Sequence, residues 1–351
     1  MDTESKNYLK AVRFESPDYI PMTFAINAAC WNSYPQEELV NLMEAHPFLF
    51  PNFKRPTLPF VPDYSVVARK DQPYTDDFGC VWTTAENGIT GTVTKHPIAE
   101  WKDFANYQAP DPSRCMGIGP MDWDETGRRF AAAKKRGDFI SAGLRHGHTF
   151  LQLCDIRGYQ NLMFDMADEE PGLWKLIDLV ESFNMGIVQR YIALGADQMS
   201  YAEDLGMQVG PMISPAFFRK YIKPSYKRLM RPAQEKGLII HMHSDGDIRE
   251  LADDLIDSGV QVINLQDLVN GIDWIADRYR NRVCVDLDID RQLITSFGTP
   301  EQIDALIREE VEKIGTPVGG LTMIYGLYPG VPIKNVAALM DAMEKYAFFY
   351  N

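Results

Sequence analysis

The sequence predicts an α/β fold in which eight parallel strands alternate with helices and close into a (β/α)8 barrel of the TIM type, with an N-terminal extension. Short runs of apolar, strand-forming residues recur along the chain, and stretches of helical length with capping signals separate them. No Gly-x-Gly-x-x-Gly segment follows the first predicted strand, which argues against the alternative of a doubly wound open sheet.

The predicted strands and helices alternate along most of the chain. Strands are expected at residues 20–26, within 78–95, and at 139–144, 198–202, 238–243, 260–265, 283–287 and 321–325. Helices are expected at residues 4–12, 36–46, 120–136, 150–166, 169–194, 214–236, 247–258, 271–280, 300–314 and 333–349. Capping signals support several helices: Ser214-Pro215 suits a helix start, and Gly259 suits a helix end.

Residues 49–95 interrupt this alternation. Residues 49–76 are rich in proline, tyrosine and aspartate without a long period, which predicts an irregular, aromatic-lined excursion. Residues 78–95 alternate apolar and polar side chains around Asn87-Gly88, a hairpin signal, and one strand of this segment is counted as a barrel strand. No linker separates the segments, so residues 1–351 are predicted to form one domain.

Composition narrows the classes of partner and the compartment. The chain has 351 residues, 45% of them hydrophobic, and a formal net charge of −14, which argues against nucleic acid or an anionic membrane as a partner. The start of the chain is polar, and no stretch has the uncharged apolar length of a membrane span. The five cysteines are scattered without C-x-x-C spacing, which is typical of reduced proteins. We therefore expect a cytoplasmic protein.

The densest group of chemically capable residues is the segment 238–247, Leu-Ile-Ile-His-Met-His-Ser-Asp-Gly-Asp. If residues 238–243 form a strand, side chains two positions apart share a face, so His241 and His243 point the same way. Asp245 follows at the carboxyl end of the strand, where the active groups of barrel enzymes converge. The alternative is a solvated strand end in which Ser244 and Asp245 cap the next helix.

The ends of the other predicted strands carry similar groups. Together they contribute Thr23, Asn27, Arg145, His146, His148, Tyr201, Glu203, Asp204, Asn264, Gln266, Asp267, Asp286, Asp288, Asp290, Tyr325 and Tyr328. The set is rich in carboxylates and imidazoles, and it contains neither a serine or cysteine nucleophile motif nor a phosphate-binding P-loop.

Three chemistries fit this set. His243, Asp245 and Glu203 are candidate ligands of a divalent metal ion that would act as a Lewis acid. The same groups are alternatively a metal-free acid–base set. Arg145 is a candidate partner for a carboxylate or phenolate of the substrate, or else an ordinary salt-bridge residue. His146 and His148 alternatively line a loop.

An ordered set of motifs resembles the uroporphyrinogen decarboxylase superfamily, which also contains cobamide-dependent methyltransferases. The motifs lie at residues 13–21, 77–82, 203–208 followed by 214–215, 243–247 and 297–301, with His-Ser-Asp-Gly-Asp at 243–247 as the strongest. The resemblance covers most of the chain and implies a (β/α)8 barrel, in agreement with the predicted strand count.

Two departures argue against the decarboxylase branch itself. Decarboxylases of this family carry an Arg-Gln-Ala-Gly-Arg segment after the first strand, which grips the porphyrinogen, whereas residues 25–31 here contain no arginine. The last predicted strand offers Ile-Tyr-Gly-Leu-Tyr at residues 324–328 in place of the decarboxylase histidine. Porphyrinogen decarboxylation is therefore not expected.

In the methyltransferase branch, His-x-Cys-Gly at this barrel position and a later cysteine often bind zinc. Residues 243–246 keep the spacing with Asp245 in place of the cysteine, so zinc binding is left open. The resemblance implies a methyltransferase that passes a methyl group from a methylated or methoxylated small molecule to a corrinoid protein. The alternatives are a decarboxylase or lyase of a small acid and a non-catalytic binding protein on a barrel scaffold.

On this interpretation the candidate residues have three roles. The catalytic candidates are His243, Glu203, Asp245 and Tyr201. The substrate-binding candidates are Arg145, His148, Asn27, Trp31, Asp204, Gln266 and Tyr325. The metal-ligand candidates are His243, Asp245 and Glu203. The expected partners are a corrinoid protein and a small-molecule methyl donor, and a homodimer is left open.

Overall fold

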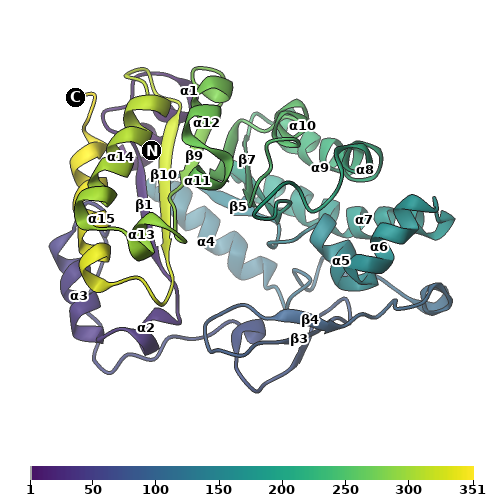
Figure 1. Ribbon diagram of the computed structural model, residues 1–351. Helices are drawn as coiled ribbons and strands as arrows, with labels where there is room; N and C mark the ends of the chain where they lie inside the picture. The colour runs from purple at the N-terminus through teal and green to yellow at the C-terminus, as the bar shows by residue number, and fades with distance from the viewer. Residues whose placement is uncertain (1) are drawn as a thin grey trace. The chain divides into compact units, whose positions relative to one another are not determined.

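The computed structural model describes residues 2–351, and these form two compact units. The central unit contains Asp2, residues 73–83 and residues 92–264, whereas the terminal unit contains residues 3–72, 84–91 and 265–351. In Figure 1 the teal and green middle of the chain forms the central unit, and the purple and yellow ends form most of the terminal unit.

The central unit is built on three neighbouring parallel strands. These are β5 (Ser141–Gly143), β6 (Gln198–Asp204) and β7 (Ile239–Asp245), with β6 in the middle. Helices α5 (Phe150–Arg157), α6 (Tyr159–Ala167) and α7 (Pro171–Leu194) connect β5 to β6. The connection from β6 to β7 contains α8 (Pro215–Phe217), a π-helical turn (Phe218–Ile222) and α9 (Lys223–Glu235). The unit also contains η2 (Trp101–Asn106), α4 (Trp123–Arg136) and α10 (Ala252–Asp257).

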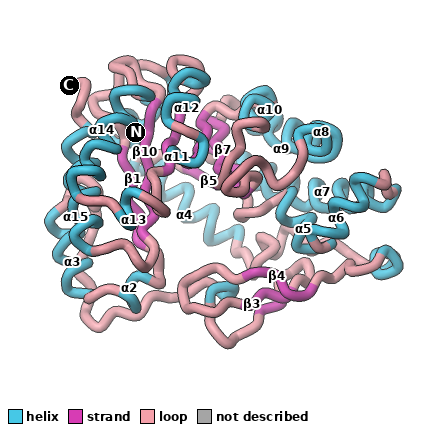
Figure 2. Tube along the Cα trace, in the orientation of Figure 1, coloured by secondary structure: helices cyan, strands magenta, loops and turns pink. Residues whose placement is uncertain are grey.

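The central unit also contains a separate antiparallel sheet of β2 (Tyr74–Thr75), β3 (Val81–Thr83) and β4 (Thr92–Lys95). Figure 2 shows β3 and β4 as a pair of their own. The predicted hairpin is therefore confirmed, and the prediction that a strand of this segment belongs to the barrel is wrong. Only eight residues join β3 to β4, whereas a parallel pair needs a crossover of a dozen or more.

The terminal unit brings together the first and last strands of the chain. β1 (Met22–Ile26) pairs in parallel with β10 (Leu321–Leu327), and β10 pairs in parallel with β9 (Cys284–Asp288) (Figure 1). Its helices are α1 (Thr3–Arg13), α2 (Cys30–Ser33), α3 (Gln36–Ala45), η1 (Val66–Ala68), α11 (Asp267–Asn270), α12 (Ile272–Tyr279), α13 (Ile294–Phe297), α14 (Pro300–Ile314) and α15 (Ile333–Ala347). β8 (Val262–Gln266) crosses the division, with Val262 in the central unit and Gln266 in the terminal unit.

The chain has the predicted α/β fold of a TIM-type barrel, in which parallel strands alternate with helices. Among residues 2–351, seven strands, β1 and β5 to β10, belong to the parallel sheet, one fewer than the sequence predicts. That residues 1–351 form a single domain stays a prediction. No helix within residues 2–351 is both long and apolar enough to cross a membrane.

Alternation of burial along β6 and β7 determines which side chains are available for chemistry. On β6, Tyr201 and Glu203 are buried, whereas Ala202 and Asp204 are partly exposed. β7 has the same pattern, with His241, His243 and Asp245 partly exposed and the residues between them buried. Because successive side chains of a strand point to opposite faces, each strand presents one set to the helices and the other to the site described below.

Candidate functional site

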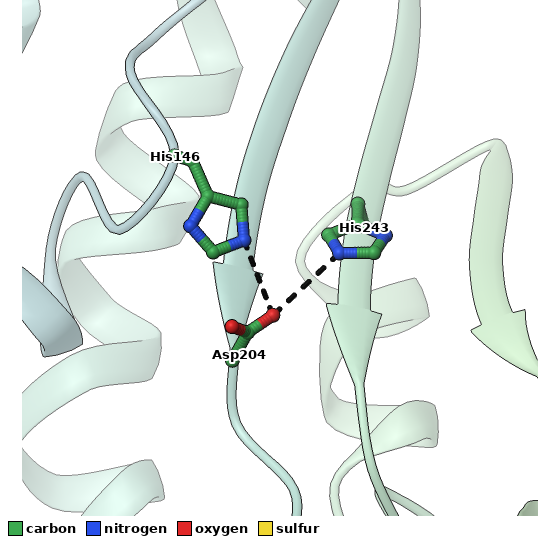
Figure 3. A group of neighbouring side chains, drawn as sticks. All are labelled: His146, Asp204 and His243. Carbon is green, nitrogen blue, oxygen red and sulfur yellow. Dashed lines mark hydrogen bonds and ion pairs between the residues drawn. The ribbon is translucent and has the colours of Figure 1, made fainter. Parts of the chain in front are cut away.

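Three polar side chains meet at the carboxyl ends of the central unit's strands: His146, Asp204 and His243. Oδ1 of Asp204 lies 3.1 Å from Nε2 of His146 and 3.5 Å from Nε2 of His243, and the two imidazole ring centres are 5.6 Å apart. Figure 3 shows both rings directed at the same carboxylate oxygen, with His146 on a loop and the other two residues on adjacent strands. The side chains are 51%, 35% and 22% exposed in that order, so none of the three is fully buried.

Strand register explains why Asp204 and His243 meet. β6 and β7 pair so that Ala202 lies opposite His243 and Asp204 lies opposite Asp245. Paired residues of neighbouring strands share a face, which puts the carboxylate and the imidazole on the same side of the sheet. Asp245 joins the cluster, since its Oδ1 lies 3.8 Å from Nε2 of His243 and its N–H donates to Oδ1 of Asp204 at 3.4 Å.

The His243 ring is held from its other side by Asn264. Nδ1 of His243 is hydrogen-bonded to Oδ1 of Asn264, an amide oxygen that can only accept. Nδ1 therefore carries a proton, and Nε2 faces Asp204 and Asp245 either as a donor in the imidazolium form or as a free lone pair in the neutral form. This arrangement fixes both the tautomer and the orientation of the ring.

The carboxylates favour the charged form of His243. Burial alone lowers the pKa of His243, but the hydrogen bond to Asp204, the charge of Asp245 and the hydrogen bond to Asn264 outweigh burial and raise it to about 9. For Asp204, burial works towards a higher pKa, yet hydrogen bonds to His146 and His243 hold the pKa of this carboxyl well below its ordinary value. In the metal-free protein the cluster is therefore an imidazolium–carboxylate pair at neutral pH.

Two glycines let the loops after β6 and β7 approach each other. A Cβ on Gly246, whose φ is +79°, would lie 2.2 Å from the carbonyl carbon of Gly206. The contact is stabilised by hydrogen bonds from the N–H of Gly206 to the oxygen of Asp245 at 3.1 Å and from the N–H of Asp247 to the oxygen of Met207 at 2.7 Å. The Gly-containing motifs at residues 203–208 and 243–247 thus bring the two carboxylate-bearing strand ends together.

His146 reaches the cluster from a loop that continues the pairing of β5 with β6. The N–H of Leu144 donates to the oxygen of Ser200 at 3.1 Å, and the N–H of Gly147 donates to the oxygen of Ala202 at 2.8 Å. Gly147 has a φ of +73°, a conformation that other residues rarely adopt. The backbone on either side of His146 is therefore tied to the strand that carries Asp204.

Glu203 lies on the opposite face of β6 from Asp204 and is fully buried. Its carboxylate accepts hydrogen bonds from the N–H groups of Thr149 and Phe150, at the start of α5, and from the hydroxyl of Tyr226 at 2.8 Å. Burial raises the pKa of Glu203 to about 7, although these donors oppose the increase. The structure therefore does not bring Glu203 together with His243 and Asp245 in one ligand set.

Two other candidates lie on the same buried face as Glu203. The hydroxyl of Tyr201 donates to the oxygen of Leu229 at 3.0 Å. His148 is buried against the rings of Tyr201 and Tyr226, and Nδ1 of its ring lies 2.6 Å from the hydroxyl of Thr149. Burial lowers the pKa of His148 to about 3, so the ring is neutral at physiological pH. Neither side chain faces the cluster.

Arg145 is also enclosed by protein. Its guanidinium donates to Oδ2 of Asp155 at 2.9 Å, lies 3.7 Å from Oδ2 of Asp76, and sits over the ring of Trp82. The side chain is 8% exposed, so these carboxylates, rather than a substrate, are its partners in the structure.

The remaining four substrate-binding candidates belong to the terminal unit. Oδ1 of Asn27 accepts the N–H of Ala29 at 2.8 Å, and Trp31 packs against Phe60. Gln266 is buried at the end of β8. Tyr325 is fully buried, and its hydroxyl donates to Thr295 at 3.3 Å.

His243, Asp245 and Asp204 are all candidates predicted from the sequence, but the role predicted for Asp204, substrate binding, is a lesser one than the catalytic role predicted for Glu203. His146 is predicted from the sequence only as a strand-end or loop residue. No sequence signal separates Asp204 from Glu203. Aligning the two strands by Gly206 and Gly246 would put Glu203 opposite His243, whereas the observed register puts Ala202 opposite His243 and Asp204 opposite Asp245. No local signal identifies His146, because its position depends on contacts of the loop with β6.

Imidazoles and carboxylates gathered at the carboxyl ends of parallel strands, within a TIM-type fold, define a barrel enzyme whose site is suited to proton transfer or metal binding. The chain belongs to the uroporphyrinogen decarboxylase family: the family model described as "Uroporphyrinogen decarboxylase (URO-D)" matches residues 75–346. The family resemblance expected from the sequence is thereby confirmed.

Curated relatives are distant. Uroporphyrinogen decarboxylase of Danio rerio is 26% identical over 183 residues, which cover 50% of this chain and 46% of the relative. The enzyme of Homo sapiens is 23% identical over 164 residues, which cover 44% of this chain and 42% of the relative. These matches thus span a little less than half the length of each relative. A solved methyltransferase from Methanosarcina mazei shares the fold, with a TM-score of 0.68 over 100% of both chains at 17% identity.

Proposed function

We propose that this protein is a methyltransferase that moves a methyl group from a methylated or methoxylated small molecule to the corrinoid of a partner protein. The observation that carries the proposal is the His146–Asp204–His243 cluster, in which one carboxylate holds two accessible imidazoles. Family membership and the likeness in fold to the Methanosarcina mazei methyltransferase support it.

The chemical requirement is stabilisation of the leaving atom. When the methyl–oxygen bond of a donor breaks, the methyl group goes to the reduced corrinoid and the bonding electron pair stays on the oxygen. The Nε2 proton of the His243 imidazolium then goes to that oxygen, and Asp204 and Asp245 keep the imidazolium in place beforehand. His146, half exposed on the other side of Asp204, connects the pair to solvent, from which His243 regains its proton.

A divalent metal ion such as zinc fits the same donor set. His146, Asp204 and His243 each offer one ligand atom, and these atoms all lie within 4.8 Å of one another. Two imidazoles and one carboxylate are ordinary zinc ligands that leave a position for substrate, and the Asn264 hydrogen bond leaves Nε2 of His243 available. When bound, zinc supplies Lewis-acid stabilisation of the leaving atom. His146 and Asp204 would then be ligands in place of Glu203 and Asp245, the ligands predicted from the sequence.

The test is a donor screen with free cob(I)alamin as methyl acceptor, followed by the absorbance change of the cobalamin. Methoxyaromatics, methanol and methylamines form the panel. We expect turnover with at least one donor and a loss of about 10²–10⁴-fold in His243→Ala. His241→Ala is the matched control, because His241 lies on the same face of β7 two residues earlier. Absence of turnover with every donor, or equal activity of His243→Ala and wild type, would contradict the proposal.

A second candidate, decarboxylation of a small acid, is favoured by the family model and by the decarboxylase relatives. The same cluster would act as an acid–base group without a corrinoid. Release of carbon dioxide from a carboxylic acid in the absence of cobalamin, with the same dependence on His243, would replace the first proposal with this one.

A further inference from the structure

We propose that Arg145 is a positioning residue for His146, and that the antiparallel sheet of the central unit contributes to the site by fixing this arginine. The inference rests on the proposed role of the His146–Asp204–His243 cluster but not on the identity of the methyl donor. It gives a function to the motif at residues 77–82, which the chemistry of the cluster leaves unexplained.

The contacts of Arg145 divide into anchoring contacts and one contact to the site. Nη2 donates to Oδ2 of Asp155 on α5 at 2.9 Å, and Nη1 lies 3.7 Å from Oδ2 of Asp76. The guanidinium carbon lies 5.6 Å from the centre of the Trp82 ring, within the range of a cation–π contact. The remaining donor, Nε, reaches the main-chain oxygen of His146 at 3.1 Å.

Asp76 and Trp82 are themselves immobilised by the antiparallel sheet. The Asp76 side chain is fully buried and accepts hydrogen bonds from the N–H of Cys80 at 2.9 Å and from the indole N–H of Trp82 at 2.8 Å. Both carboxylate oxygens are therefore used, and Trp82 is held in register by its pairing with Tyr74. The sheet presents a carboxylate and an aromatic face to one guanidinium.

His146 is consequently held on both sides of its Cα. Nε of Arg145 donates a hydrogen bond to the carbonyl oxygen of His146, and the N–H of Gly147 donates to the oxygen of Ala202 on β6. Because the ring must keep a 3.1 Å contact with Asp204, a small rotation of this loop would separate the two groups. A misplacement of about 1 Å in a catalytic constellation can reduce the rate by about 10²-fold.

The geometry also argues against Arg145 as a substrate-binding group. Two carboxylates already flank the guanidinium, and the side chain is 8% exposed. A substrate carboxylate would have to displace Asp76 or Asp155 from an enclosed position. The arginine therefore acts through the backbone of His146 and does not touch the substrate.

The chain supplies a matched control in Arg157. This arginine is also 8% exposed, donates to Asp165 at 2.8 Å and lies 4.9 Å from the centre of the Trp101 ring, but no hydrogen bond in the described residues joins it to His146. Arg145→Lys and Arg157→Lys remove the same kind of buried, carboxylate-paired and tryptophan-stacked guanidinium. A general loss of stability should affect both variants, whereas loss of positioning should affect only Arg145→Lys.

The first measurement is amide hydrogen exchange of the full chain, which does not depend on any activity. We expect residues 144–149 to exchange about tenfold faster or more in Arg145→Lys and to remain as in wild type in Arg157→Lys. Equal exchange of this segment in the two variants would overturn the proposal. Because the readout needs no substrate, this result stands whether or not the protein transfers methyl groups.

The second measurement is kinetic, with the donor found in the screen or the acid found in the decarboxylation assay. Arg145→Lys should lower kcat about tenfold or more and leave KM within about twofold of wild type. In the double variant with His146→Ala, kcat should be no lower than in His146→Ala alone. An increase in KM alone, or additive effects in the double variant, would show that Arg145 binds substrate directly and would overturn the positioning role.

Discussion

Asp204 and His243 lie on adjacent strands with Oδ1 of the carboxylate 3.5 Å from Nε2 of the imidazole, and the same oxygen contacts His146. A single carboxylate oxygen thus contacts two imidazoles. Burial of the His243 ring disfavours its positive charge, and the hydrogen bond to Asp204 is the largest of the contacts that favour the charged form.

Asp204→Asn should therefore lower the pKa of His243. In chelator-treated wild type, we expect His243 to titrate near pH 9 by NMR, and the variant to titrate at least one pH unit lower. The folded-state pKa is above the ordinary value of about 6.5, so the pair stabilises the folded protein fully below about pH 6.5 and loses this contribution as pH rises through about 9. An unchanged titration of His243 in Asp204→Asn would contradict this.

Metal content provides a second prediction. Elemental analysis of the purified protein should find about one zinc per chain if the cluster is a metal centre. His146→Ala and Asp204→Ala should each weaken zinc affinity by about tenfold or more, whereas His241→Ala should not. Zinc that persists unchanged in both cluster variants would show that it binds elsewhere on the chain.

Gly246→Ala should disrupt the site through sterics. The added Cβ would lie 2.2 Å from the carbonyl carbon of Gly206, and φ is +79°. We expect the free energy of unfolding, measured with urea, to fall by about 2 kcal/mol or more, together with loss of activity. Gly210→Ala, in the loop after β6, is the control, since φ is +77° and nothing lies within 4 Å of the added atom. Its free energy of unfolding should fall by only about 1 kcal/mol.

Glu310 in the terminal unit should make stability depend on pH. Burial, reinforced by the neighbouring carboxyl of Asp267, raises the pKa of Glu310 well above its ordinary value. The folded state keeps this proton while the unfolded chain releases it above about pH 4.3, so stability falls as pH rises beyond that value.

Glu310→Gln should remove that dependence. We expect the free energy of unfolding of this variant, measured with urea, to exceed that of wild type by an amount that grows between pH 4.5 and pH 8, because the amide carries no charge to bury. Glu309→Gln, which alters an exposed salt bridge to Lys313, should change stability by about 0.5 kcal/mol or less at either pH. A constant difference between Glu310→Gln and wild type across this range would contradict the prediction.

The fold could be predicted from the sequence wherever local patterns decide it. Seven of the eight expected barrel strands are present, because apolar runs between capped helices specify buried parallel strands. The exception, residues 78–95, has an alternating pattern that does not distinguish a barrel strand from a hairpin strand. Its short strands pair with each other because the connection between them is too short for a parallel crossover.

By itself, the sequence determined that histidines and carboxylates collect at the carboxyl ends of the strands, since strand periodicity places His243 and Asp245 on one face. Only the tertiary structure decided which of two consecutive acids, Glu203 or Asp204, joins them. That choice depends on the register between β6 and β7, a non-local property that moves a side chain to the opposite face when it shifts by one residue. The position of His146 was likewise decided by tertiary contacts, through the hydrogen bonds of its loop to β6 and to Arg145.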